Sequence, residues 1–190
     1  MDVTAWIMYL LLMIVVAVAA VIDWRTQLVP NRLTYPAVLA GLVIWPIAGA
    51  IFGGSELALE WSRDSWFGMF CGLIPFAILV MTAGLGGGDM KLMAAVGALS
   101  ASWEVVLSTT IYALLVAVVM AVVVMVRQGV VKETLSRVFS AALLASAKVK
   151  ADLPEDGPKV AFAAAVAVGA AVAGAEQMLG LDTPWRGFSP

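Results

Sequence analysis

The sequence predicts an all-α, polytopic membrane protein with six transmembrane helices and one cytoplasmic amphipathic helix. Of its 190 residues, 63% are hydrophobic and 13% are charged, and the mean hydropathy is +1.00. A typical soluble domain has about 25% charged residues. The apolar residues gather in runs of about 20, the length that crosses a bilayer as a helix. We therefore expect one integral membrane domain over residues 1–190, with the lipid bilayer as its surroundings.

The first half of the chain predicts three spans separated by polar breaks. Ala5 to Ile22 is an uninterrupted apolar run of 18 residues, about 27 Å long as a helix. Pro30 ends any continuation of that helix. The segment 54–65 contains three acidic residues and one basic residue, which is typical of a polar external loop. The spans expected on either side of these breaks are residues 5–22, 35–53 and 66–85.

The second half predicts three more spans and a surface helix. Residues 89–103 are apolar but short, so they form either a true crossing or a re-entrant segment. Residues 105–126 form a long apolar span. Residues 127–159 are polar with helical periodicity, which favours an amphipathic helix on the cytoplasmic membrane surface. The last span, 160–181, has small residues at every fourth position that allow close helix packing: Ala161, Ala165, Gly169 and Ala173.

Two residue types are nearly absent, and this narrows the chemistry. The chain has no histidine, which excludes Ser-His and Cys-His hydrolases and any His-ligated metal site. Its single cysteine, Cys71, lies inside an apolar run and is expected to pack as a small hydrophobic side chain. No basic tract suits nucleic acid. We expect no metal and no cofactor, so acid–base chemistry would depend on carboxylates.

A glycine-rich stretch followed by an acid interrupts the apolar pattern. Gly86, Gly87 and Gly88 immediately precede Asp89 and Lys91 lies two residues further on. Glycines permit positive φ and close approach of another chain, so an extended peptide could lie against this backbone beside Asp89. An ionisable group at the end of a membrane helix indicates a functional site. The alternative is a glycine-rich turn in which Asp89 caps the next helix.

The distribution of basic residues predicts which side of the membrane this stretch faces. With six spans and both termini outside, nine Lys and Arg residues lie inside and only Arg63 and Arg186 outside. The nine inside are Arg25, Arg32, Lys91, Arg127, Lys132, Arg137, Lys148, Lys150 and Lys159. A failed crossing of residues 89–103 would remove most of this bias, which favours a true crossing.

This topology places two acids at the same membrane depth. Asp23 ends the first span and Asp89 begins the fourth, both at the cytoplasmic end. Two carboxyl groups held close cannot both ionise easily, so one keeps a proton. The ionised group can activate water for attack on an amide carbonyl, while the protonated group polarises that carbonyl and protonates the leaving nitrogen. Asp23 and Asp89 are therefore the predicted catalytic pair of an aspartic protease.

Lys91 has two interpretations. Its ammonium group lowers the pKa of Asp89 or contacts a substrate carbonyl, which would make it a substrate-binding residue together with Gly86, Gly87 and Gly88. Alternatively, Lys91 is a membrane anchor whose side chain reaches the interface. A spacing of two residues puts Lys91 and Asp89 on different helix faces, which favours the anchor.

These residues together resemble the type IV prepilin peptidases, aspartic proteases of the bacterial cytoplasmic membrane with a GxGD motif. The resemblance rests on Asp23, on Pro30-Asn31, and on Gly86 to Lys91 with the continuation Leu92 to Ala98. It implies that Asp23 and Asp89 are catalytic. It also implies that the partner is a pilin-like precursor with a short basic leader ending in glycine before a hydrophobic helix, cut at the cytoplasmic face of the inner membrane.

The chain is shorter than the larger members of that family. Those members have a cytoplasmic domain with paired cysteines and N-methyltransferase activity, whereas this chain starts directly with its first span. It is similar to the peptidases that serve tight-adherence (Flp) pili. Cleavage without methylation is therefore expected, and the sequence leaves the oligomeric state open.

Three other functions remain compatible with the residues. A proton- or cation-coupled transporter could use the same two aspartates, but it should show inverted repeats and acids near the midplane. The sequence shows neither, since both acids fall at the ends of predicted helices. A presenilin-like protease would have its paired motifs on adjacent helices, whereas two spans intervene here. A catalytically inactive scaffold of a secretion machine is the third.

Overall fold

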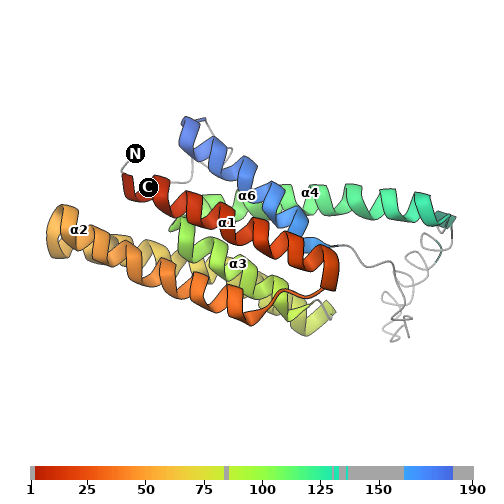
Figure 1. Cartoon of the computed structure of the whole chain (residues 1–190), viewed down its shortest axis with the longest axis horizontal. Helices are drawn as coiled ribbons and strands as arrows, with labels where there is room; N and C mark the ends of the chain where they lie inside the picture. The colour runs from red at the N-terminus through yellow and green to blue at the C-terminus, as the bar shows by residue number, and fades with distance from the viewer. Residues whose placement is uncertain (1–2, 84–85, 130, 133–135, 137–160, 182–190) are drawn as a thin grey trace. The chain divides into compact units, whose positions relative to one another are not determined.

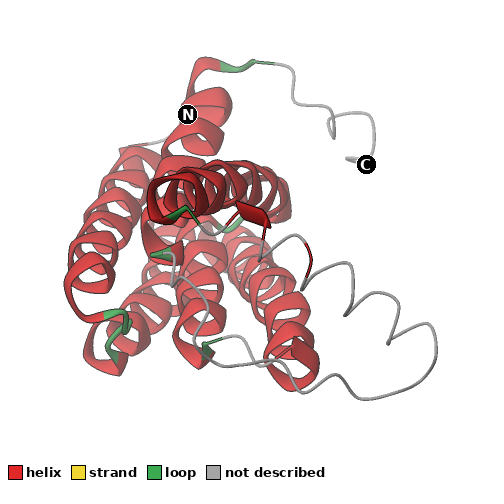
Figure 2. Ribbon diagram, turned by 90° about the vertical axis from the view of Figure 1, so that its right-hand side faces the viewer, coloured by secondary structure: helices red, strands yellow, loops and turns green. Residues whose placement is uncertain are grey.

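The computed structural model describes residues 3–83, 86–129, 131–132, 136 and 161–181, and in these ranges every regular element is a helix (Figures 1 and 2). Contacts between Cα atoms group the chain into two compact units. The first unit contains the residues up to Leu114 together with those from Ala161 onward, and the second contains the residues between Leu115 and Val160. All of the candidate site lies in the first unit.

Helix α1 (Val3–Thr26) packs with one face inward and leaves the other exposed. Its buried residues recur at intervals of three and four, as the 3.6-residue helical period requires. They are Thr4, Met8, Leu12, Val15, Val16, Ala19 and Asp23. The opposite face exposes large apolar side chains such as Leu10, Ile14 and Val21, which suits contact with lipid. Asp23 is therefore the last residue of the buried face, and it is a carboxylate.

Helix α2 (Asn31–Ala83) is folded back on itself at Gly54, where φ is 76° and ψ is −162°. Only glycine readily adopts this backbone conformation. A Cβ added at Gly49 would lie 2.8 Å from the Cα of Ala58, and the rings of Trp45 and Trp61 are 5.4 Å apart. The two arms of α2 therefore lie side by side.

This hairpin corrects two sequence-based expectations. The predicted external loop over 54–65 is wrong, because residues 55–65 are helical and form the start of the second arm. A single glycine makes the turn, so the acidic residues there need no loop and sit on helical backbone. The second predicted span also begins earlier than position 35, since α2 starts at Asn31.

Helix α3 (Gly87–Ser100) is the core of the first unit. All residues from Leu92 to Leu99 are buried, which is typical of a helix surrounded by others. It packs mainly against α2, at distances that only glycine allows: a Cβ at Gly97 would lie 2.0 Å from the carbonyl oxygen of Gly68. Ala101, with φ of 46°, ends the helix.

Helix α4 (Trp103–Gln128) and helix α6 (Phe162–Leu179) complete the described elements. The predicted small-residue ridge of the last helix is buried as expected, at Ala161, Ala165, Gly169 and Ala173. A Cβ at Gly169 would lie 2.6 Å from the carbonyl oxygen of Thr109 in α4. Beyond α4 and a few isolated positions, the predicted amphipathic helix over 127–159 lies outside the described residues.

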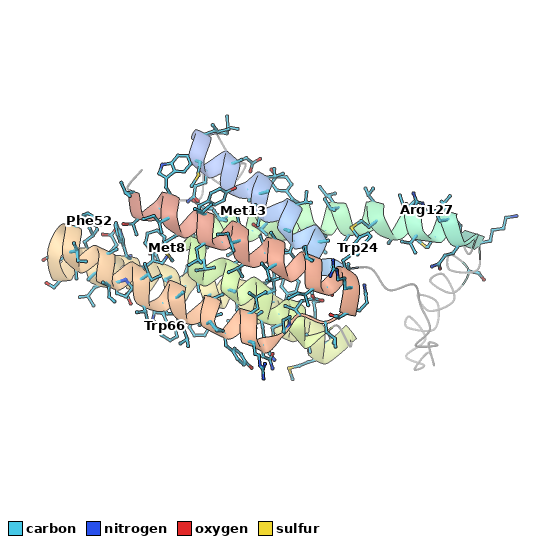
Figure 3. All side chains as sticks on the ribbon, viewed as in Figure 1. Met8, Met13, Trp24, Phe52, Trp66 and Arg127 are labelled. Atoms are coloured by element: carbon cyan, nitrogen blue, oxygen red, sulfur yellow. The ribbon has the colours of Figure 1, made fainter. Side chains whose placement is uncertain are left out.

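Four of the described helices, α1, α2, α4 and α6, are long and apolar enough to cross a membrane. The sequence predicted six spans. Two of the predicted spans lie within the bent helix α2, and the predicted span 89–103 corresponds to α3, whose 14 residues rise only about 21 Å. The exposed side chains of Trp24 and Phe52 lie near opposite ends of these helices (Figure 3), as aromatic residues at the two membrane interfaces do.

Candidate active site

Four helix ends meet at one end of the first unit: the C-terminus of α1 and the N-termini of α2, α3 and α6 (Figure 1). Gln27, with φ of 54°, ends α1 and turns the chain toward Val29 and Pro30. Val29 is buried and packs on Gly88, where an added Cβ would lie 3.1 Å from the Val29 Cβ. The segment that follows Asp23 is thus in contact with the turn that precedes Asp89.

Asp23 is almost completely enclosed, with 6% of its surface exposed. Its Oδ2 accepts a hydrogen bond of 3.0 Å from the backbone N–H of Ala163 in the first turn of α6. Its own carbonyl oxygen accepts bonds from the backbone and side chain of Gln27, at 2.8 and 3.2 Å. The carboxylate is therefore held between two helices that are distant in sequence.

Asp89 lies in the first turn of α3, outside the four candidate membrane spans. Its backbone N–H donates to the carbonyl oxygen of Gly86 at 3.1 Å, and its Oδ2 lies 3.6 Å from the position of a Cβ at Gly86. Burial, and after it the negative charge of Asp23, raise the pKa of Asp89 to about 6. The two acids are 66 positions apart in sequence (89 − 23), yet they are near enough to interact electrostatically.

The three predicted substrate-binding glycines differ in their surroundings. None has a positive φ, so they are not required for an unusual backbone conformation. Gly88 is needed for the contact with Val29, whereas a Cβ at Gly87 would meet nothing within 4 Å. Gly86 is exposed, with φ of −63° and ψ of 125°. Gly86 and Gly87 therefore present open, extended-to-helical backbone next to Asp89.

Lys91 is engaged by α2. Its Nζ donates to the Oδ1 of Asn31 at 2.8 Å and lies 5.3 Å from the centroid of the Tyr35 ring, within cation–π range. The causes that shift the pKa of Asp89 are burial and Asp23. Lys91 thus links the first turn of α3 to the first turn of α2.

The described residues contain no group of three or more His, Cys, Asp or Glu side chains that could hold a metal ion.

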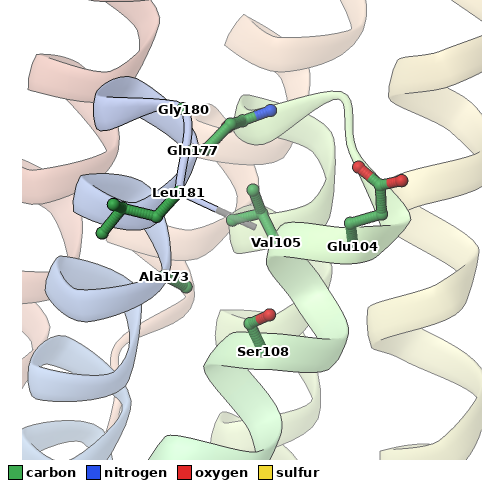
Figure 4. Close-up of a pocket in the computed structure, with 7 residues that line it drawn as sticks. All are labelled: Glu104, Val105, Ser108, Ala173, Gln177, Gly180 and Leu181. Carbon is green, nitrogen blue, oxygen red and sulfur yellow. The ribbon is translucent and has the colours of Figure 1, made fainter. Parts of the chain in front are cut away.

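A cavity of about 140 Å³ lies between α4 and α6, lined by Glu104, Val105, Ser108, Ala173, Gln177, Gly180 and Leu181 (Figure 4). It sits at the C-terminal end of α6, and Asp23 binds the N-terminal end, about 27 Å away along an 18-residue helix. This cavity is therefore separate from the two aspartates.

Sequence reasoning missed three participants in the site. The N–H of Ala163 is a backbone group, which leaves no trace in the residue type. Val29 resembles any apolar residue before a proline. The sequence singles out Asn31 only as part of the Pro30-Asn31 pair, and its partner Lys91 is 60 positions away. The period of the buried face of α1 could have shown that Asp23 points inward.

Comparison with known proteins identifies the family. The chain matches the type IV leader peptidase family over residues 10–126, which is more than half of its length and includes both Asp23 and Asp89. No curated protein and no solved structure matches the chain. With its apolar helices, the matched region agrees with a membrane-embedded peptidase. The chain belongs to the type IV leader peptidase family.

Proposed function

We propose that this protein is an aspartic endopeptidase of the bacterial inner membrane that removes the short leader of pilin-like precursors at the cytoplasmic face. Asp23 and Asp89 are its catalytic pair. The observation that carries the proposal is the approach of these carboxyl groups, one buried at the end of α1 and one in the first turn of α3, at the same end of the first unit.

The surroundings of the two acids support different roles. Asp89, whose pKa is raised to about 6, holds the proton. It donates that proton to the substrate carbonyl oxygen as the water attacks. When the tetrahedral intermediate collapses, Asp23 gives the proton it took from the water to the leaving nitrogen, and Asp89 recovers a proton from the hydroxyl group of the intermediate. Asp23 accepts a hydrogen bond at Oδ2 and keeps Oδ1 for the attacking water, from which it takes a proton. Such a pair performs amide hydrolysis with neither histidine nor metal.

Gly86 and Gly87 supply the surface for the substrate backbone in this proposal. A peptide strand can approach them closely because neither has a side chain. A Cβ at Gly87 would meet nothing within 4 Å, and a Cβ at Gly86 would meet only Oδ2 of Asp89, at 3.6 Å. Gly88 acts differently, since it holds the Asp89 turn against Val29. Because Lys91 donates a hydrogen bond to Asn31, we propose that its role is to hold α3 against α2. A contact between Lys91 and the substrate stays a prediction.

The charges around the site support a cytoplasmic orientation. The end with the two aspartates carries Arg25, Arg32 and Lys91, and basic residues favour the cytoplasmic side. The turn between the arms of α2 is followed instead by Glu56 and Glu60. We propose six crossings, with each arm of α2 and the enclosed helix α3 counted separately, and we expect cleavage without N-methylation.

Co-expression with a precursor tests this function. The precursor has a basic leader ending in glycine, followed by a hydrophobic helix, and cleavage appears as a mobility shift on a gel. We expect Asp23→Asn and Asp89→Asn to abolish the shift while the enzyme still inserts into the membrane.

Asp64→Asn is the matched control. This acid lies on the second arm of α2 beside Ser65, whose hydroxyl donates to the carbonyl oxygen of Ala98 at the far end of α3. We expect Asp64→Asn to cleave normally. Processing that persists in either of the other two variants contradicts the proposed pair.

A further inference from the structure

The first turn of α6 is bonded to Asp23 across 140 positions of sequence. The bond joins the backbone N–H of Ala163 to Oδ2 of Asp23 at 3.0 Å. Both residues are buried, and Ala163 has no exposed surface. A hydrogen bond to a carboxylate is electrostatically stronger in such a buried place than at the surface, where water competes for both groups.

Helix α6 lacks the usual means of satisfying its first turn. Its N-cap is Ala161, which forms no side-chain cap, and its first turn contains no acidic residue. Ala163 is the second residue of the helix, a position whose N–H a capping side chain normally binds. Asp23 therefore takes the place of the missing cap, and the helix dipole favours the negative charge of its carboxylate there.

The first turn of α6 is anchored by contacts that do not involve Asp23. The ring of Phe162 packs against Phe76 of α2, with centroids 5.8 Å apart. Further along, the Tyr9 hydroxyl of α1 donates to the carbonyl oxygen of Ala171 at 3.1 Å. The helix end is thus a fixed point against which the carboxylate is oriented, rather than a loose end that the carboxylate must hold in place.

We propose that the Ala163 N–H is a positioning group for the reaction, holding Oδ2 of Asp23 so that Oδ1 remains free for the attacking water. This inference rests on the proposed function and extends it. Residue 163 lies outside the 10–126 region that matches the family, so α6 supplies part of the site that the matched region does not contain.

The test removes the N–H of residue 163 and leaves Asp23 unchanged. Proline has no N–H and is tolerated in the first turn of a helix, so Ala163→Pro deletes the donor. We expect kcat for cleavage of the precursor described above to fall about 10- to 100-fold, the effect of losing one hydrogen bond to a charged group. KM should change by less than about twofold, because the substrate backbone binds elsewhere.

Two matched variants separate positioning from a structural role. Ala163→Gly keeps the N–H and should cleave within about twofold of the wild type. Ala164→Pro places the same ring one residue later and leaves the Ala163 N–H intact; Ala164 donates to Ala161 within the turn. If α6 needed the bond only for folding, Ala163→Pro would lower the melting temperature more than Ala164→Pro does, and kcat per folded molecule would be equal in the two variants.

Each outcome decides the inference. Loss of kcat in Ala163→Pro alone supports it. Normal kcat in folded Ala163→Pro overturns it and leaves the proposed function standing, whereas a wild type that does not cleave overturns both. If Ala163→Pro does not fold, replacing Ala163 by lactic acid changes the N–H to an ester oxygen at almost constant shape, and the same kcat criterion applies.

Discussion

The side chain of Val29 lies against Gly88, so that a Cβ at position 88 would come within 3.1 Å of the Val29 Cβ. This contact joins the segment after Asp23 to the turn before Asp89. Gly88→Ala should therefore push the two segments apart and lower kcat by about tenfold or more, since misplacing catalytic groups by a fraction of an ångström is costly. Purified enzyme and the precursor in detergent give the measurement.

Gly87→Ala is the control for that prediction, because a Cβ there meets nothing within 4 Å. If Gly87 lies against the substrate backbone, the added methyl group raises KM and leaves the melting temperature unchanged. Equal effects of the two alanines on kcat and KM would show that neither glycine has the role assigned to it.

The pH dependence of cleavage should follow Asp89. Its pKa is raised to about 6 in the folded protein from its ordinary value of 3.8. If Asp89 must be protonated to donate, kcat/KM falls about tenfold for each pH unit above 6. A rate that stays constant between pH 6 and 8 would contradict the role of Asp89 as proton donor.

The raised pKa of Asp89 also predicts how the stability of the folded protein changes with pH. Because the folded protein holds the proton of Asp89 more tightly than the unfolded chain does, stability from this group is present below pH 3.8 and is lost as the pH rises through about 6. Asp89→Asn should therefore melt at a higher temperature than the wild type at pH 8, with a smaller difference at pH 5. Thermal unfolding in detergent measures the difference. A wild type that melts at a higher temperature than Asp89→Asn at pH 8 would contradict the prediction.

Lys91 and Asn31 should behave as a pair. Their bond of 2.8 Å ties α3 to α2, so Lys91→Met or Asn31→Ala should each destabilise the protein by about 0.5–1.5 kcal/mol. The double variant should cost less than the sum of the two. Thermal unfolding of the four proteins gives the coupling. Additive losses would mean that the bond contributes nothing.

Much of the fold follows from the sequence because apolar length and period are local signals. The spacing of the residues predicts both the buried face of α1 and the small-residue ridge of α6. The hairpin in α2 was not foreseen, because the acidic residues after Gly54 resemble a loop and a single glycine can make the turn. The helical length of α3 alone also could not show that it is enclosed.

The candidate site divides in the same way. Asp23 and Asp89 can be recognised in the sequence because a carboxylate beside an apolar membrane segment is energetically unfavourable, and such a residue therefore indicates a functional site. Their neighbours do not stand out: the Ala163 N–H belongs to the backbone, and its position depends on where α6 begins. The bond from Lys91 to Asn31 depends on how α2 and α3 pack. Such long-range contacts become visible only in three dimensions.

The most direct test of the catalytic pair is the cleavage rate of purified Asp23→Asn, Asp89→Asn and the double variant, each compared at equal amounts of folded enzyme. Groups that act as one unit lose their effect together. We therefore predict that either single variant is as inactive as the double variant, within a few-fold. A single variant that retains substantial cleavage, with a further loss in the double variant, would contradict the claim that the two carboxyl groups work as a pair.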